Sequence, residues 1–295
     1  MRSPIPSPRE SGFTTTTTDP LYWAAYGPPE ADRLVVLHGG PGAHHDYLLP
    51  QMLHLAERYD VLFYDQRGGG RSRSGSSANI TVSTHVADLA AVLSEFSIDA
   101  PAIVGYSWGG MLALQYLLQT RRDPSLPKPA CLALIDPAPL SREYRRAFEK
   151  EFAARQSGPR ITAMRSDLES SGLKEIDPAA YRERMFELAV APYFANPENA
   201  RDLTPFRVTG RVMESVWSSL GPEYNIIPDL FPAGCPTLFV HGRDDPIPME
   251  SSIEGAKAMN AELVLLDDCG HVPYVEQSGP LFAALDAFLA ARDPK

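Results

Sequence analysis

The chain has 295 residues and 44% of them are hydrophobic, which is enough to build a substantial core in one large α/β domain or in a core with a smaller second domain. Its formal net charge of −10 at pH 7 argues against binding nucleic acid or an anionic membrane through a general electric field, and it favours a small-molecule or short-peptide substrate as partner. No apolar run approaches the roughly 18 residues of a membrane-spanning helix, and the first residues lead into no hydrophobic signal region, so we expect a cytoplasmic protein.

Residues 1–19 form a biased segment that has little to bury. Prolines dominate its first half and a run of threonines, 14–18, fills the second. This composition predicts a flexible N-terminal arm or an edge strand. We expect the ordered core to begin with the strand-like run at 21–26.

The chain then alternates between strand-like and helix-like segments. Short apolar runs at 34–37, 61–64, 102–104 and 132–135 predict buried strands. Between the second and third of them, 82–96 places apolar residues at helical spacing. Alternation of this kind predicts a parallel sheet covered by helices on both faces.

A helical insertion interrupts this alternation. From about 140 to 229 we find charge-rich amphipathic stretches, such as 143–155 and 179–191, and no convincing buried strand. Strand character returns at 237–240 and 262–266, and a closing helix is expected across 280–291. The sequence therefore predicts a core of 20–139 and 230–295 with a helical cap at 140–229. In open parallel sheets ligands bind at the carboxyl ends of the strands, where the cap is expected to meet the core.

The run Gly-Tyr-Ser-Trp-Gly at 105–109 lies between an apolar strand and a helix-like segment. Glycines two residues before and after Ser107 leave room for the tight turn that holds a serine hydroxyl clear of the backbone. The pattern alone would occur by chance in about one chain in ten of this length, so its context decides. With a strand before it, a helix after it, and an acid and a histidine downstream, it predicts a nucleophile elbow and a serine hydrolase.

Acyl transfer by serine needs a base and a carboxylate that orients the base. Asp244 and Asp245 follow the strand 237–240, and His271 follows the strand 262–266, so the chain order Ser, Asp, His is that of an α/β hydrolase. We prefer Asp245 as the acid, because it lies three residues after Gly242 and directly before a proline, on the expected turn. Asp244 is expected to be a solvated or capping neighbour.

Two backbone N–H groups are needed to hold the oxygen that becomes negative in the tetrahedral intermediate. One is expected from Trp108, the residue after the nucleophile. The glycine-rich loop 38–42 lets the backbone approach a ligand closely, so we assign the second N–H to Gly40 and expect Gly39 to border the substrate.

Three motifs occur together in this chain: His-Gly-Gly-Pro-Gly at 38–42, Asp-Gln-Arg-Gly-Gly-Gly-Arg-Ser at 65–72 and Gly-Tyr-Ser-Trp-Gly-Gly at 105–110. In order and spacing they resemble those of the proline iminopeptidases (prolyl aminopeptidases), which have the α/β-hydrolase fold. The resemblance covers about 21–119 and 235–291. It implies a mostly parallel central sheet with an inserted cap, Ser107 as nucleophile, Asp245 as acid, His271 as base, and no cofactor. It also implies release of N-terminal proline from small peptides or amides.

That family holds the free amino terminus of its substrate with acidic side chains, one from the cap and, in some members, one directly after the catalytic aspartate. This chain has Pro246 at the latter position. Glu214 and Glu223 are candidate cap carboxylates, and Trp217 is a candidate for lining the substrate pocket. A buried ammonium needs a paired acid, so without one a neutral ester or lactone would fit better. A carboxylesterase or lactonase is thus the alternative activity.

Other classes of function fit this sequence less well than a hydrolase. The histidines at 38, 44, 45 and 54 fit no metal-ligand spacing, and the three widely spaced cysteines fit reduced thiols better than disulfides or a metal site. The arginine- and glycine-rich run 65–75 is no phosphate loop, and we expect Asp65 and Arg67 to brace the floor of the active site. A non-catalytic binding protein on the same fold remains the alternative from another class.

Overall fold

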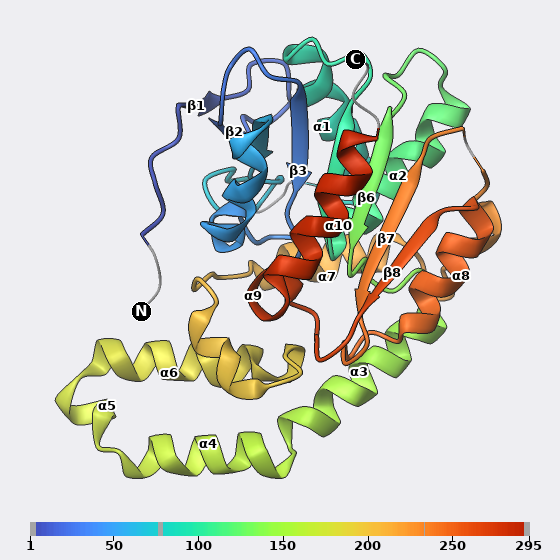
Figure 1. Cartoon of the computed structure of the whole chain (residues 1–295). Coiled ribbons are helices and arrows are strands. Elements are labelled where there is room, and N and C mark those ends of the chain that lie inside the picture. The colour runs from blue at the N-terminus through green and yellow to red at the C-terminus, as the bar shows by residue number, and fades with distance from the viewer. Residues whose placement is uncertain (1–3, 76–78, 233, 292–295) are drawn as a thin grey trace.

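Within residues 4–75, 79–232 and 234–291, which the computed structural model describes, eight strands form one mixed sheet in the order β1-β2-β4-β3-β5-β6-β7-β8 (Figure 1). The strands are β1 (Glu10–Phe13), β2 (Tyr22–Tyr26), β3 (Arg33–Leu37), β4 (Asp60–Tyr64), β5 (Ala102–Tyr106), β6 (Cys131–Ile135), β7 (Thr237–Gly242) and β8 (Glu262–Leu266). The two N-terminal strands pair antiparallel, and β3 to β8 run parallel. The predicted, mostly parallel sheet is confirmed.

Helices cover both faces of this sheet, and others extend from one end of it. In chain order the helices of the described residues are α1 (Val82–Glu95), α2 (Trp108–Arg122), α3 (Arg142–Gln156), α4 (Pro159–Ser170), α5 (Leu173–Ile176), α6 (Pro178–Val190), α7 (Gly210–Ser219), α8 (Met249–Met259), α9 (Pro273–Glu276) and α10 (Ser278–Ala290). Short 3-10 helices are η1 (His45–Leu48), η2 (Gln51–Glu57), η3 (Ala191–Tyr193), η4 (Pro197–Asp202) and η5 (Ile227–Asp229).

The apolar strands bury side chains on both faces, because successive residues of a strand point in opposite directions. Leu34 and Val36 of β3 belong to the core shared with η2 and α10, whereas Val35 and Leu37 belong to the core shared with α1 and α2. Continuous apolar runs are what a sheet covered on both sides requires. This explains why the strands were visible in the sequence.

The N-terminal segment supplies an edge strand. Strand β1 pairs with β2, and the next residues are held by Glu95, which accepts hydrogen bonds from the N–H groups of Thr15 (2.9 Å) and Thr16 (2.9 Å). Of the two structures predicted for 1–19, the edge strand is present at Glu10–Phe13; residues 1–3 lie outside the described part of the chain.

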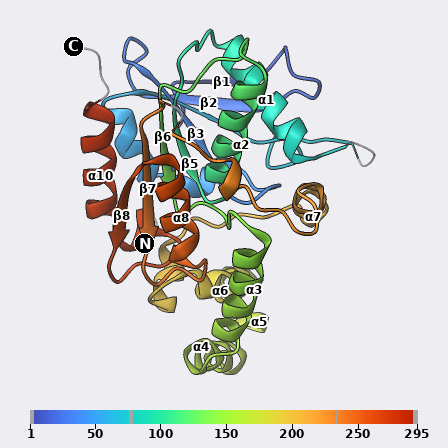
Figure 2. The same cartoon turned by 90° about the vertical axis from the view of Figure 1, so that its right-hand side faces the viewer.

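Between β6 and β7, the named elements of the described chain are all helical, as predicted. Helices α3 to α6 project beyond one end of the sheet, while α7 lies apart from them, beside α1 (Figures 1 and 2). The Ser215 hydroxyl of α7 donates to the carbonyl of Ile80 (2.7 Å), and the Val82 N–H donates to Ser219 (3.0 Å). The segment 140–229 is therefore not one packed layer, because α7 is attached to the core.

Candidate active site

A sharp turn between β5 and α2 carries Ser107. Its φ of 52° and ψ of −116° lie outside the usual regions for an L-residue. A β-carbon on Gly105 would lie 2.6 Å from the carbonyl oxygen of Gly109, and one on Gly109 would lie 2.1 Å from that of Leu37, so both positions require glycine. The Ser107 N–H donates to the carbonyl of Ile135 in β6 (2.9 Å), which fixes the turn at the carboxyl edge of the sheet.

Ser107, His271 and Asp245 meet at the carboxyl ends of β5, β8 and β7. His271 Nε2 lies 2.9 Å from Ser107 Oγ, and its Nδ1 lies 2.7 Å from Asp245 Oδ2. The Ile247 N–H donates to Asp245 Oδ1 (2.7 Å) and holds the carboxylate in place. The structure thus brings the three side chains into one hydrogen-bonded relay, whereas Asp244 is exposed.

The loop after β3 packs against Ser107. A β-carbon on Gly39 would lie 2.8 Å from Ser107 Cβ and 2.8 Å from the Tyr47 hydroxyl, so glycine is required there. Gly40 has a φ of 63° and its carbonyl accepts from the Ala43 N–H (2.8 Å) in a tight turn. Trp108 is the first residue of α2, where backbone N–H groups have no acceptor within the helix.

Gln66 connects three parts of the site and was not singled out in the sequence. Its N–H donates to His38 Nε2 (3.0 Å), its amide nitrogen donates to the His38 carbonyl (2.8 Å), and its amide oxygen accepts from Trp108 Nε1 (2.8 Å). The glycine loop, the segment after β4 and the start of α2 are therefore fixed relative to one another. Its place in the motif 65–72 was the available signal.

Asp65, directly before Gln66, accepts hydrogen bonds from two neighbouring segments. It accepts from His45 Nδ1 (2.7 Å) and from the Arg71 N–H (2.9 Å). Burial acts to raise the pKa of Asp65, but the hydrogen bond and charge of His45, the charge of His38 and the hydrogen bond from the Arg71 N–H together outweigh it and hold that pKa below its ordinary value. Arg67 instead pairs with Asp88 of α1 and with Asp19 (2.6 Å), so it ties the loop to the N-terminal segment.

The family model for the alpha/beta hydrolase fold matches residues 32–278, which is most of the chain. The chain belongs to the α/β-hydrolase fold family. The helix-flanked sheet, with Ser107 on the turn after β5, is the arrangement expected of this family.

Individual α/β hydrolases match over nearly the whole length. The proline iminopeptidase of Lactobacillus delbrueckii subsp. bulgaricus is 28% identical over 284 residues, covering 88% of this chain and 90% of the relative. The solved proline iminopeptidase-related protein of Thermus thermophilus superposes with a TM-score of 0.72 at 22% identity, covering 96% and 97% of the two chains. Naproxen esterase of Bacillus subtilis gives a TM-score of 0.67 at 15% identity over 97% and 92%. The resemblance to proline iminopeptidases is confirmed, and the fold is shared with an esterase.

In this α/β hydrolase, Glu214 and Trp217 lie on α7, along a groove of about 480 Å³ that Arg142, Arg145 and Arg146 also line. The Arg145 guanidinium stacks 3.9 Å from the centre of the Trp217 ring, and that ring packs edge-on against Trp108, with centroids 5.6 Å apart. Glu214 is exposed. Glu223 also lines this groove and pairs with Arg146 (2.6 Å).

A second, wider cleft of about 860 Å³ lies between the glycine loop and the cap. Gly42 of the loop, Phe206, and Glu183 of α6 are among its lining residues. The Phe206 ring stacks on Tyr47, with centroids 4.3 Å apart, and Tyr47 in turn touches the Gly39 position. Glu183 is therefore a cap carboxylate on the side of the glycine loop, and no sequence motif distinguished it.

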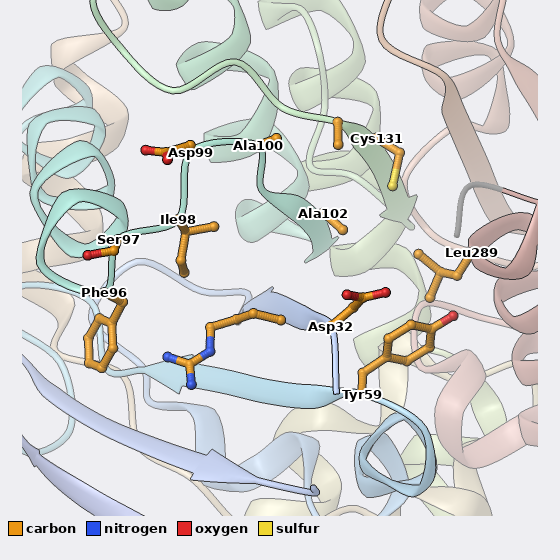
Figure 3. Close-up of a pocket in the computed structure, with 12 residues that line it drawn as sticks. Asp32, Tyr59, Phe96, Ser97, Ile98, Asp99, Ala100, Ala102, Cys131 and Leu289 are labelled. Carbon is orange, nitrogen blue, oxygen red and sulfur yellow. The ribbon is translucent and has the colours of Figure 1, made fainter. Parts of the chain in front are cut away.

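A cavity of about 540 Å³ lies at the opposite edge of the sheet (Figure 3). Asp32, Ala102 and Cys131, which line it, stand at or just before the amino ends of β3, β5 and β6. Ligands of open parallel sheets bind at the carboxyl ends, where Ser107 lies. We therefore place the functional site there and not in this cavity.

Among the residues that the structure describes, Asp136, His241 and Asp245 form a buried group whose polar atoms lie within 4.8 Å of one another, a spacing that metal ligands share. Both ring nitrogens of His241 are hydrogen-bonded, Nε2 to the Ile247 carbonyl (3.1 Å) and Nδ1 to the Ser252 hydroxyl (2.9 Å). Asp245 Oδ2 is engaged by His271. Metal binding would break these bonds, so the arrangement favours a hydrogen-bonded cluster.

The cap is joined to the loop that carries His271. The His271 N–H donates to the carbonyl of Tyr193 (2.7 Å), and the Tyr193 ring stacks on the imidazole with centroids 5.1 Å apart. Glu276 accepts from the N–H groups of Gly270 (2.8 Å) and Asn196 (3.0 Å).

Within the part of the chain that the structure describes, no helix has the length and apolar character needed to cross a membrane.

Proposed function

We propose that this protein is a serine hydrolase that works through an acyl-enzyme. The observation that carries the proposal is the relay from Ser107 through His271 to Asp245, with contacts of 2.9 and 2.7 Å. In the proposed cycle His271 takes the proton of the attacking Ser107 hydroxyl, and Asp245 stabilises the imidazolium. His271 then protonates the leaving group, and water repeats the sequence on the acyl-enzyme.

The oxyanion is assigned to the backbone N–H groups of Gly40 and Trp108. Trp108 supports this role because it starts α2, where an uncompensated N–H and the helix dipole both favour negative charge. Gly39 supports it by bringing the glycine loop into contact with Ser107. One such donor typically contributes about 3–4 kcal/mol to transition-state stabilisation, so the loop matters nearly as much as the relay.

For the substrate, the first candidate is the N-terminal proline of a small peptide or amide. The three motifs and the curated proline iminopeptidases support it. A substrate of this kind carries an ammonium group at its free amino terminus, and this group needs a carboxylate in the pocket. Glu183 beside the glycine loop and Glu214 on α7 are the two cap carboxylates to compare.

A small neutral ester or lactone is the second candidate, and two observations favour it. Pro246 stands directly after Asp245, so no carboxylate is supplied there. In addition, both cap carboxylates share their grooves with arginines, Glu214 with three of them and Glu183 with Arg182 and Arg207, and these charges disfavour an ammonium ligand. A non-catalytic binding protein is the least favoured interpretation, because the relay is intact.

A hydrolysis panel separates these functions. We expect cleavage of prolyl arylamide to exceed that of alanyl arylamide, and to be lost when the prolyl amine is blocked, because a blocked amine has no charge to pair with a carboxylate. Initial rates on these three amides and on short-chain nitrophenyl esters provide the measurement. Cleavage of esters alone would rule out the aminopeptidase, and failure of a fluorophosphonate to label the protein would favour the binding protein.

Paired variants locate the amine anchor within the same panel. Glu183→Gln and Glu214→Gln each remove one cap carboxylate at constant size. The variant that loses activity on the free prolyl amide but keeps activity on the esters identifies the anchor. Equal losses on both substrate types would instead indicate damage to the cap.

The pH profile follows from the buried pair. Burial raises the pKa of Asp245 to about 6 and lowers the pKa of His271 to about 4. Activity needs an ionised Asp245 beside a neutral His271, and this state is present above about pH 6 and lost as the pH falls through it. We expect kcat/KM on a neutral nitrophenyl ester to decline below about pH 6, with a midpoint that belongs to the coupled pair. A profile that stays flat well below that pH would contradict the assignment.

A further inference from the structure

Asp136 is a second buried acid beside Asp245, and the relay described above does not include it. It follows β6, whose last residue, Ile135, pairs with Tyr106 before the nucleophile and with Val240 of β7. Asp136 therefore stands between the strand that carries Ser107 and the strand that leads to Asp245. Its side chain is 0% exposed and its φ is 41°, a conformation that aspartate tolerates better than most residues.

The two oxygens of Asp136 have different surroundings. Oδ1 accepts from the Gly242 N–H (2.8 Å), whereas Oδ2 has no hydrogen-bond donor among the described residues. The neighbouring polar atoms are those of His241 and Asp245, all within 4.8 Å. A buried carboxylate oxygen without a donor is costly, and a second carboxylate beside it adds repulsion.

His241 does not supply the missing positive charge. Its Nε2 donates to the Ile247 carbonyl (3.1 Å), so a neutral ring has its proton on that nitrogen, and Nδ1 is then free to accept from the Ser252 hydroxyl at 2.9 Å. A neutral ring therefore satisfies both contacts. Burial also lowers the pKa of His241, which keeps the ring neutral at pH 7.

We propose that Asp136 is a positioning residue for the relay: it keeps its proton on Oδ2 and donates it to the carboxylate of Asp245. The proposal rests on the proposed hydrolase, because it assigns a role within the same relay. The two acids then share one proton and carry one negative charge. That charge stays on Asp245, where it faces the imidazolium that forms on His271.

The electrostatics around Asp136 agree with this arrangement. Burial, followed by the charge of Asp245, raises the pKa of Asp136 well above its ordinary value. The titratable groups that act on Asp136, or on which it acts, are Tyr106 of β5, His241 and Asp245 of β7 and its turn, Cys269 and His271 of the loop after β8, and Tyr274 of α9. None of these six side chains carries a permanent positive charge that would ionise Asp136.

Two variants test the proton on Asp136. In Asp136→Ala the donor to Asp245 is lost, so Asp245 and His271 both become more basic. We expect kcat/KM to fall about tenfold and its acid limb to move to higher pH. In Asp136→Asn an amide NH2 replaces the acidic proton and the amide oxygen still accepts from Gly242. We expect Asp136→Asn to restore the acid limb and most of the activity that Asp136→Ala loses.

An ionised Asp136 would predict the opposite direction for the shift of the acid limb. If Asp136 were ionised, Asp136→Asn would remove a negative charge beside the pair, and the acid limb would move to lower pH. That shift, or a loss in Asp136→Asn as large as in Asp136→Ala, overturns the proposal. Asp244→Asn is the matched control, since it removes an exposed carboxylate one residue from Asp245 and is expected to leave the limb in place.

An infrared measurement is independent of activity and of the folding of the alanine variant. At pH 7 the wild-type protein is expected to show the C=O stretch of a protonated carboxyl group, and the difference spectrum against Asp136→Asn should assign it to this residue. Absence of that band overturns the proposal. If the band is present but Ser107 is not labelled by a fluorophosphonate, the proposed hydrolase fails and the protonated acid stands.

Discussion

Ser107→Ala is expected to reduce kcat on esters and amides by about 10⁵- to 10⁶-fold, because the variant has no nucleophile and the remaining relay cannot act alone. The side chain of Ser107 contacts His271 through one hydrogen bond, so the thermal midpoint should change little. Single-turnover assays and fluorophosphonate labelling, read by intact-protein mass, provide the measurement.

Ser170→Ala is the control for this experiment. Ser170 is exposed near the end of α4, and its hydroxyl bonds only within that helix. Labelling should persist in this variant and vanish in Ser107→Ala. A Ser107→Ala protein that still takes the label would show that another residue is the nucleophile.

Asp245→Asn is expected to lower kcat by about 10⁴-fold with little change in KM. The amide occupies the same space, but its NH2 faces His271 Nδ1 and favours the tautomer with the proton on Nε2, which cannot accept the proton of Ser107. Steady-state kinetics on a nitrophenyl ester measure the effect, and Asp244→Asn controls for the loss of one charge on this turn. A fall of less than about tenfold would remove Asp245 from the relay.

Sequence patterns located the core elements because the physics there is local. Each parallel strand carries a short apolar run. Ser107 is flanked by glycines because backbone oxygens lie where a β-carbon on either of them would have to be. Helix α8 was missed for the opposite reason. Apart from Met259 at its end, its buried residues are small, namely Ser251, Ser252, Gly255 and Ala256, and these give little apolar periodicity.

Contacts between distant segments were not predictable in the same way. Gln66 and Asp136 act through partners that are far away in the chain, and neither residue type signals burial. The positions of the two cap carboxylates could not be predicted either. Glu214 and Glu183 both lie on cap helices, but they line different grooves because α7 packs against α1. The role of Glu214 as an amine anchor stays a prediction.

The hydrogen bond from the His271 N–H to the Tyr193 carbonyl and the contacts of Glu276 join the cap to the loop that carries His271. The cap therefore helps to position the proposed base. Lifting this part of the cap away from the core would also displace His271 from Ser107. We therefore expect this part of the cap to stay on the core while the relay works. The proposed hydrolase would then act on molecules that reach Ser107 past a fixed cap, which favours short substrates over long chains.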